Sequence, residues 1–440
     1  MNSLDKLTIQ GFKSIRELDD FELKSLNLFI GANGAGKSNL ISFFRLLHAV
    51  MEGNLNSYVI DNGGMSDLLF NGRKETESMY FEMRFGMRGH RFRLRPGASE
   101  EPNIVDEARY YASGKTQWWI MGDSFDGKSK VATEADGANG DAEYSRPIVN
   151  AIKSWQIYHL HDTSATAGMR HYGIIQDYRK LRIDASNLAT YLAFLRDIHP
   201  ASYAGILDAV RLVTPFFDDF ILEPRKMGEA EKVNLSWRQK GSDYPMQPYH
   251  LSDGTIRFIA LATALLQPEP PSTIIIDEPE LGLHPHALAI LAELIQDAAT
   301  RTQLIIATQS ATLLDYFGVE DIVVVKRHEG SSTFTRLEQK DYDKWLEDYT
   351  VGELWTKNVI TGGPILDECG EPEAINHEKE TSPSHRLDDL CTNSFSKTST
   401  GIAIAQAIGL PRIREACPLF NQWVRVIEGL AETHKLGTCP

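Results

Sequence analysis

Short continuous runs of apolar residues alternate along this chain with segments in which apolar residues recur at helical spacing. Residues 25–30 and 271–276 are continuous runs, typical of strands buried in a parallel sheet. Residues 39–48 and 256–266 have the helical spacing instead. Strands followed by helices in this way predict an α/β fold.

Elsewhere the pattern changes to the alternation expected of half-buried strands. Residues 80–85 and 90–94 predict a hairpin, and residues 107–112 and 116–121 predict another. The stretch 123–144 is rich in Gly, Asp, Ser and Ala, so we expect a flexible loop there.

The region 146–245 is expected to be mainly helical. Residues 187–195 and 203–217 have helical apolar spacing. We find no sustained heptad repeat, so a long coiled-coil arm is not expected.

The turn between the first buried strand and its helix carries a complete G-x-x-x-x-G-K-[ST] motif. Its glycines let backbone N–H groups point at phosphates, and the helix N-terminus adds about half a positive charge. Lys37 would reach the β- and γ-phosphates of ATP, and the Ser38 hydroxyl would bind Mg²⁺. An ordinary glycine-rich turn is the alternative, but the strand–loop–helix context favours a nucleotide site. The predicted phosphate-binding residues are Gly31, Ala32, Asn33, Gly34, Ala35, Gly36, Lys37, Ser38 and Asn39.

Two acidic residues, Asp277 and Glu278, follow the apolar run at 271–276. The carboxyl end of a strand is where an open α/β sheet places ligand chemistry. We expect Asp277 to hold Mg²⁺ through its water shell, and Glu278 to orient and polarise the attacking water. Many strands end in acids, so this prediction depends on the phosphate loop upstream.

Residues 251–255 (Leu-Ser-Asp-Gly-Thr) precede a helical run, with Ser252 as the candidate N-cap of an anion-binding helix N-terminus. Taken alone, this is a plain capped helix. Its place before the acidic strand resembles the LSGGQ-like signature of ABC, SMC and RecF-type ATPases, with Asp253 at the first Gly and Thr255 at the Gln. The resemblance implies that Ser252 and Gly254 contact the ATP of a second subunit.

The same resemblance extends downstream. Residues 279–285 stand where these ATPases have the D-loop, residues 303–308 form the next strand, and Gln309 takes the switch position usually held by His. A glutamine can hydrogen-bond a γ-phosphate or a water, but it does not change charge near neutral pH. Phosphate sensing by Gln309 is therefore expected, whereas fast turnover is in doubt. A Q-loop Gln is not found.

The chain thus resembles the bacterial AAA-type ATPases of the OLD and RecF group over residues 1–100 and 245–363. The resemblance implies an ABC-type P-loop head with two lobes, a mixed β sheet, a mainly helical insert and a short C-terminal appendage. The expected domains are an ATPase lobe with antiparallel strands at 1–145, the insert at 146–245, a second ATPase lobe at 246–363 and a tail at 364–440.

The tail is polar, and parts of it resemble a small TOPRIM-like protein family that accompanies such ATPases. Residues 410–423 resemble the end of that family, and residues 368–373 resemble its opening acidic motif. The D-x-D pair of a two-metal nuclease is missing. We therefore expect a truncated or degenerate TOPRIM-like tail that docks a partner.

Composition agrees with a cytoplasmic enzyme. The net charge of −15 opposes coating of nucleic acid by bulk electrostatics. No apolar run approaches the roughly 18 residues of a membrane span, and the N-terminus lacks the apolar stretch of a signal peptide. The four cysteines form no C-x-x-C pair, so free thiols in a reducing compartment are expected rather than a zinc site.

Local clusters of basic residues and histidines are further candidate sites. Nucleic acid could contact two basic clusters, although a solvated surface is the commoner role of such residues. His159, His161 and Asp162 are metal-binding types, but two histidines on one strand are more often structural. The basic clusters are Arg91, Arg93 and Arg95 on one hairpin face, and Arg170, Arg179, Lys180 and Arg182.

The resemblance implies a head-to-tail homodimer, or a higher even oligomer, with ATP and Mg²⁺ between subunits. Hydrolysis assisted by Glu278 and Gln309 would loosen the dimer, so the expected function is an ATP-driven switch. The resemblance also suggests that the switch gates an effector, a nuclease or a toxin, in anti-phage defence. The alternatives are a DNA repair or recombination ATPase, a non-hydrolysing scaffold, and a transporter subunit, which would need the absent Q-loop Gln and switch His.

Overall fold

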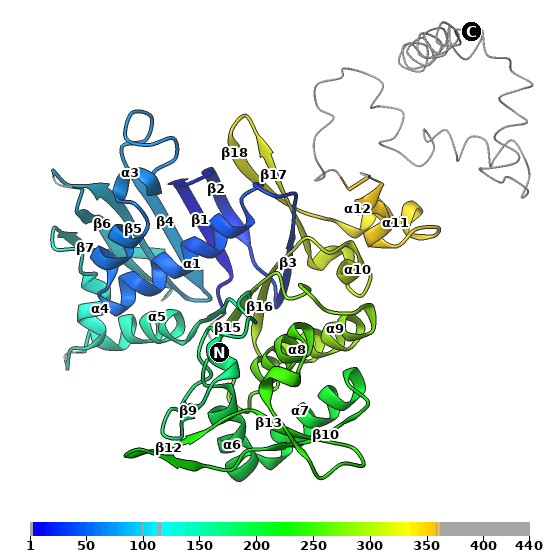
Figure 1. The fold of residues 1–440 in the computed structure, drawn as a ribbon. Helices are drawn as coiled ribbons and strands as arrows, with labels where there is room; N and C mark the ends of the chain where they lie inside the picture. The colour runs from blue at the N-terminus through cyan, green and yellow to red at the C-terminus, as the bar shows by residue number, and fades with distance from the viewer. Residues whose placement is uncertain (1–2, 99, 113–115, 139, 358, 361–440) are drawn as a thin grey trace, which may run out of the picture. The chain divides into compact units, whose positions relative to one another are not determined.

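The computed structural model describes residues 3–98, 100–112, 116–138, 140–357 and 359–360, all of which belong to one compact unit, Met1–Pro364. The predicted tail at 364–440 lies outside the described residues. The described chain forms two six-stranded sheets and a lobe of helices with short strands (Figure 1).

The first of the two large sheets, called the N-terminal sheet, is antiparallel throughout, with the strand order β2-β1-β4-β5-β6-β7. Both predicted hairpins are confirmed as β4–β5 and β6–β7. Its strands are β1 (Lys6–Phe12), β2 (Ile15–Glu22), β4 (Met79–Phe85), β5 (Arg88–Pro96), β6 (Pro102–Ala112) and β7 (Thr116–Ser124).

The second, called the central sheet, has the order β18-β17-β3-β16-β15-β8. Its strands are parallel except for the β17–β18 hairpin, so the sheet is mixed as expected. The carboxyl ends of β3, β15 and β16 therefore meet at one edge. Its strands are β3 (Leu26–Ile30), β8 (Gln156–Tyr158), β15 (Thr273–Asp277), β16 (Gln303–Thr308), β17 (Ile322–His328) and β18 (Ser331–Arg336).

Alternate side chains of the central sheet enter two different cores. Leu28 and Ile276 face a core shared with α8 (Asp253–Leu265) and α9 (Pro285–Ala299). Phe29 and Ile275 face the other core, where helix α1 (Lys37–Glu52) and the N-terminal sheet also pack. This alternation follows from the period of two along a strand. Buried on both faces, the sheet holds the ends of its strands rigidly.

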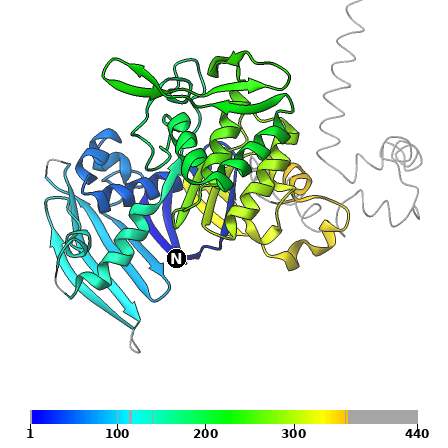
Figure 2. The same cartoon turned by 90° about the horizontal axis from the view of Figure 1, so that it is seen from below.

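The predicted helices of the insert are confirmed as α6 (Leu188–Ile198) and α7 (Pro200–Val213). The structure adds short strands that the sequence analysis did not predict, and they form two three-stranded sheets in the same lobe (Figure 2). Strands this short carry too few residues for a clear alternation of apolar and polar positions. They are β9 (Gly173–Ile174), β10 (Phe217–Ile221), β11 (Arg225–Met227), β12 (Ala230–Val233), β13 (Ser236–Gln239) and β14 (Pro245–Met246).

The prediction of a flexible loop over 123–144 is wrong. The segment contains α4 (Lys130–Ala135) and the start of α5 (Ala142–Ser154). Ser129 caps α4 by accepting a hydrogen bond from the Ala132 N–H, and Val131 is fully buried. Packing against β6 and β7, rather than local propensity, makes this polar segment helical.

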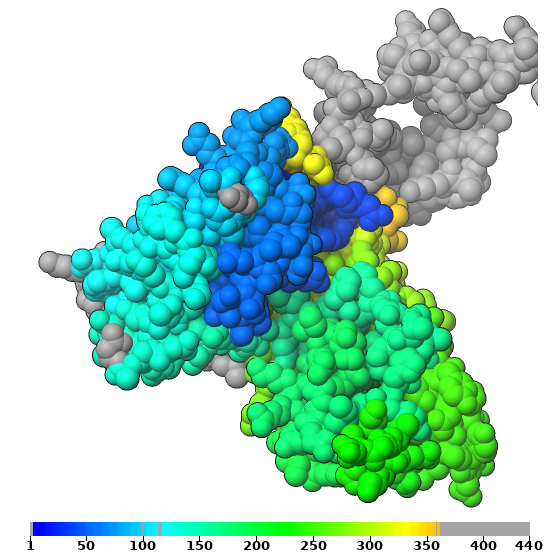
Figure 3. Space-filling view, turned by 60° about the vertical axis from the view of Figure 1, so that its left-hand side comes forward, coloured from blue at the N-terminus to red at the C-terminus, as the bar shows by residue number. Residues whose placement is uncertain are grey.

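The remaining elements connect these layers. None of the helices in the described ranges combines the length and apolar character needed to cross a bilayer. In the space-filling view the blue-to-cyan residues of the N-terminal sheet and the green residues of the insert form separate lobes (Figure 3). The connecting helices are α2 (Leu55–Asp61), α3 (Met65–Leu68), α10 (Ala311–Leu314), α11 (Gln339–Leu346) and α12 (Val351–Thr356).

Candidate functional site

The glycine-rich turn lies between β3 and α1, as the motif requires. Gly36 is the N-cap of α1 with a φ of 118°, a left-handed conformation that favours glycine. A Cβ there would also collide with the Ser332 hydroxyl. That hydroxyl donates a 2.6 Å hydrogen bond to the Ala35 carbonyl, so the hairpin β17–β18 supports the turn from behind.

A cavity of about 210 Å³ opens at this turn. It joins the phosphate loop to the residues that follow β15 and β16, and to the end of β17, the other neighbour of β3 in the sheet. Of the predicted phosphate-binding residues, Gly31, Ala32 and Ala35 are not part of the lining. The lining consists of Asn33, Gly34, Gly36, Lys37, Ser38, Asn39, Glu278, Gln309 and Arg327.

Lys37 is folded back onto its own loop. Its Nζ donates to the carbonyl oxygens of Gly31, at 2.6 Å, and Ala32, at 3.2 Å. Burial lowers the pKa of Lys37, and the charges of Glu278 and Asp277 oppose that shift. An anion in the cavity would give this partly desolvated cation a stronger partner than neutral carbonyls.

Glu278 and Gln309, the two predicted catalytic residues, are in contact. The Gln309 side-chain amide donates to Glu278 Oε1, and the Gln309 backbone N–H donates to Glu280 at 2.8 Å. Glu278 has a φ of 46°, which is strained for a residue with a side chain. The Glu278 N–H bonds the Ala307 carbonyl at 2.8 Å, so β16 holds the strained turn in place.

Asp277 is the last residue of β15 and is 9% exposed. Burial raises its pKa, and the neighbouring charge of Glu278 adds to the shift. Burial likewise raises the pKa of Glu280. Acids that crowd one another at the mouth of a phosphate loop would be relieved by a divalent cation, which fits the metal role predicted for Asp277.

Ser252 caps α8 as predicted, because its Oγ accepts a hydrogen bond from the Thr255 N–H at 3.1 Å. Ser252 is exposed, and neither it nor Gly254 lines the cavity. A Cβ at Gly254 would collide with the Gly282 carbonyl, so the signature turn packs directly on the D-loop segment. The capped helix end thus faces solvent rather than its own subunit's phosphate loop.

Arg257 is a residue of this site that the sequence analysis missed. It lies in the first turns of α8 and is 7% exposed. Its guanidinium donates to the carbonyls of Leu160 at 2.8 Å, His161 at 3.1 Å, and Leu281. One side chain therefore joins the signature helix, the segment after β8 and the D-loop. No sequence motif marks it, because its partners are backbone carbonyls.

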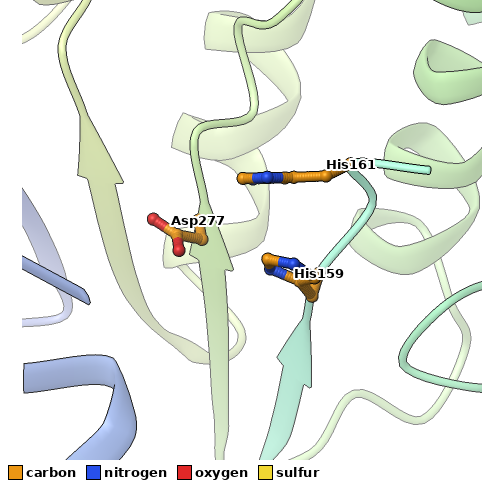
Figure 4. Close-up of side chains that lie close together, drawn as sticks. All are labelled: His159, His161 and Asp277. Atoms are coloured by element: carbon orange, nitrogen blue, oxygen red, sulfur yellow. The ribbon is translucent and has the colours of Figure 1, made fainter. Parts of the chain in front are cut away.

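His159 and His161 lie after β8, not on a strand as expected, because β8 ends at Tyr158. Their rings stack with centroids 4.1 Å apart beside Asp277 (Figure 4). Burial lowers the pKa of His159, and the neighbouring His161 adds to that effect. Asp162 is not the third member of this group, because its carboxylate caps the Ser164 N–H instead.

Arg327 lines the cavity and is a second residue that the sequence analysis missed. It lies near the end of β17, which runs parallel to β3 and so reaches the same sheet edge. Its Nη1 donates a 3.4 Å hydrogen bond to the Gly34 carbonyl. A basic cluster, Lys326-Arg327-His328, at the end of an apolar strand is the signal that could have revealed it.

Part of each basic cluster is engaged in contacts within the described chain. Arg170 is a structural residue, because its guanidinium donates to the carbonyls of Pro248 and Leu251 and pairs with Asp253 at 2.7 Å. On the hairpin, Arg91 lies over the Trp118 ring at 4.3 Å. The Nε atom of Arg93 lies 3.4 Å from Oδ2 of Asp106. Nucleic-acid binding through these clusters stays a prediction.

Comparisons with solved structures return SMC head domains. One is the SmcHead bound to the C-winged helix domain of ScpA, with 17% identity and a TM-score of 0.48 over 78% of this chain and 99% of that one. Another is the SMC head domain from Thermotoga maritima, with 16% identity and a TM-score of 0.39 over 76% of this chain and 99% of that one. A third is the Smc head domain with an extended coiled coil from Pyrococcus furiosus, bound to the C-terminal domain of ScpA. It has 17% identity and a TM-score of 0.45 over 79% of this chain and 99% of that one. No curated protein matches the chain.

Two family models match the sequence. A domain of unknown function, DUF4276, matches residues 346–428, most of which lie outside the described residues. The second model, described as "AAA domain, putative AbiEii toxin, Type IV TA system", matches residues 26–315. That match runs from β3 to the residues after Gln309 and so includes the phosphate loop, the signature turn and the acidic strand. The chain is therefore a P-loop AAA-domain protein and belongs to this family.

Proposed function

We propose that this chain binds ATP with a divalent cation, hydrolyses it, and uses the reaction to switch between paired and separated states. The cavity carries this proposal, because it gathers Lys37 and Ser38 with Glu278 and Gln309 from distant parts of the sequence. Typical small-molecule pockets measure about 300–1,000 Å³. At about 210 Å³ this cavity suits the phosphate tail alone, with the nucleoside outside it.

The charged and polar lining groups would have roles in phosphoryl transfer, together with Asp277, which does not line the cavity but interacts with the charge of Lys37. Lys37 and Arg327 supply positive charge to the phosphate oxygens, together with N–H groups at the start of α1. Ser38 and Asp277 would hold the divalent cation, which neutralises charge on the β- and γ-phosphates when bound. Glu278 would accept a proton from the attacking water, and Gln309, already bonded to Glu278, would hold that carboxylate in line.

The position of the signature turn supports the proposed pairing of two copies. Ser252 caps a helix whose N-terminus is exposed, and neither Ser252 nor Gly254 lines the cavity of its own chain. Helix N-termini bind anions. A two-fold axis would place this turn of each copy over the nucleotide of the other, and hydrolysis of the γ-phosphate would remove the shared contact.

The output of the switch is proposed to be a partner effector, a nuclease or a toxin, in defence against phage. The support is the family description, which names a toxin of a type IV TA system. The second matched domain, at residues 346–428, adds a segment beyond the ATPase where a partner could dock.

The test uses the full chain with Lys37→Ala, Glu278→Gln and the exposed control Lys128→Ala. ATP affinity is measured by calorimetry, turnover by phosphate release, and mass in solution by light scattering with and without ATP. Lys37→Ala should lose ATP binding. Glu278→Gln should keep binding and the ATP-induced pair but lose about 10²–10⁴-fold in turnover. The control should match the wild type.

Two outcomes would contradict parts of this proposal. Wild-type ATP affinity in Lys37→Ala would show that the cavity is not the nucleotide site. Unchanged turnover and pair lifetime in Glu278→Gln would leave the protein as a scaffold that ATP only holds together.

A further inference from the structure

His159 and His161 meet Asp277 at the carboxyl edge of the central sheet. β8 and β15 are parallel neighbours, with Tyr158 opposite Ile276, so the residues that follow them lie side by side. One ring nitrogen from each histidine and a carboxylate oxygen of Asp277 all lie within 4.8 Å of one another. The close-up shows both rings directed toward the end of β15 (Figure 4).

The three ligand atoms, within 4.8 Å of one another, would have to draw together around a bound ion. Imidazole and carboxylate ligands bind first-row metals at about 2.0–2.2 Å, which places neighbouring ligand atoms about 3 Å apart. His159 is exposed, so its ring can turn toward Asp277 within its rotamer wells. Shifts of this size are ordinary when a site loads its ion.

His161 provides a second, independent observation. Its Nε2 is buried and has no hydrogen-bond partner among the described residues, and Glu278 Oε2 lies 4.0 Å away. A buried ring nitrogen without a partner costs free energy, and natural proteins rarely leave one without a reason. Arg257 bonds the backbone carbonyls of Leu160 and His161, so the loop that carries this nitrogen is fixed.

We propose that His159, His161 and Asp277 bind a divalent first-row transition metal, with Mn²⁺ and Zn²⁺ preferred over Mg²⁺. Mg²⁺ takes oxygen ligands in octahedral geometry, whereas imidazole suits the transition ions. The carboxylate of Glu278 adds negative charge at Asp277, and the cations Arg45 and Lys37 oppose it.

The shared Asp277 places this ion beside the proposed nucleotide site, so its role in the ATPase reaction rests on the proposed function. The binding of the metal does not rest on the proposed function, because all three ligands come from the protein. The metal should therefore bind without nucleotide.

The experiment follows Mn²⁺ binding to the full chain, stripped with a chelator and free of nucleotide. Free Mn²⁺ is counted by its solution EPR signal, and imidazole coordination is detected by ¹⁴N modulation in pulsed EPR. We expect one Mn²⁺ per chain with ¹⁴N coupling, and competition by Mg²⁺ only at about tenfold or greater excess. His159→Gln and His161→Gln should each weaken binding by about tenfold or more and reduce the ¹⁴N signal. The control is His171→Gln, because His171 is an exposed histidine ten residues after His161. It should leave the Mn²⁺ affinity and the ¹⁴N signal unchanged.

Three results would overturn the site. They are Mn²⁺ bound without ¹⁴N coupling, equal affinity for Mn²⁺ and Mg²⁺, and wild-type affinity in both glutamine variants. His159 is exposed, so its variant tests the site even if His161→Gln fails to fold.

Lys37→Ala separates this inference from the proposed function. If the metal site is correct, Lys37→Ala binds Mn²⁺ at least as tightly as the wild type, because a positive charge acting on Asp277 is removed, while losing ATP. If the metal site is wrong but Lys37 still governs ATP affinity, the proposed function stands alone.

Discussion

Replacing Arg257 by methionine should disconnect the signature helix from the catalytic edge of the central sheet. Arg257 donates to three backbone carbonyls, those of Leu160, His161 and Leu281, on two segments outside its own helix. Methionine keeps much of the apolar stem that packs in the interior and removes only the guanidinium. The substitution therefore tests the hydrogen bonds rather than the volume.

The expected cost follows from those bonds. A hydrogen bond to a charged group contributes about 1.5–3 kcal/mol. Three of them set an upper limit of roughly 5–9 kcal/mol, but His161 and Leu281 are partly exposed, so water can reach freed carbonyls there. We therefore expect a loss of about 2–4 kcal/mol in the free energy of unfolding. Displacing the D-loop and the His161 loop by about 1 Å should lower turnover by about 10²-fold.

Arg301→Met is the matched control. Arg301 also donates to backbone carbonyls, those of Leu265 and Gln267, but it lies beside the start of β16, at the sheet edge opposite the cavity. Urea unfolding should show a loss of about 1–2 kcal/mol in this control, with phosphate release unchanged. Equal losses of turnover in both variants, or full turnover in Arg257→Met, would refute the proposed connection.

Three further predictions concern other parts of the molecule. Burial raises the pKa of Glu107, but the interactions with His90, the Ser129 hydroxyl and the Lys130 N–H together outweigh burial and hold that pKa below its ordinary value. Glu107 therefore stabilises the fold above pH ~4.5. In urea unfolding at pH 7, the wild type should be more stable than Glu107→Gln by about 2–3 kcal/mol, and this difference should shrink as the pH falls below ~4.5. Gly254→Ala should cost about 1–3 kcal/mol in thermal unfolding, because its methyl group collides with the Gly282 carbonyl. Arg327→Ala should weaken ATP binding by about tenfold in calorimetry, since it removes a cation from the phosphate cavity and no packed side chain.

The sequence predicted those elements whose pattern is both long and tied to a motif. β3, α1, β15, α8 and β16 lie where their apolar runs and the phosphate loop predict them, with ends shifted by a few residues. Ser252 as a helix cap was also predicted, because capping is a local interaction. Local rules suffice where the partners are neighbours in the chain.

The predictions that failed depend on partners far away in the sequence. α4 forms in a polar stretch because Glu107, on β6, accepts hydrogen bonds from Ser129 and the Lys130 N–H at its start. The histidine pair was grouped with Asp162, its neighbour in the chain, whereas the carboxylate beside it belongs to Asp277. Only the pairing of β8 with β15 brings these residues together, and no short motif encodes that pairing.

The position of Arg257 has a thermodynamic consequence for the proposed switch. Arg257 lies on the helix that follows the signature turn, which would contact a partner's nucleotide, and its guanidinium is bonded to the Leu160 and His161 carbonyls of the loop that would hold the metal. A ligand that shifts one of them changes the free energy of the other, and coupling between binding sites is reciprocal. Pairing around ATP should therefore change the affinity for Mn²⁺ by some factor. Mn²⁺ should change the equilibrium constant of pairing by the same factor. In Arg257→Met both factors should fall together and by the same amount, because Arg257 carries part of the connection; Arg170, which bonds the Thr163 and Leu251 carbonyls, carries another part.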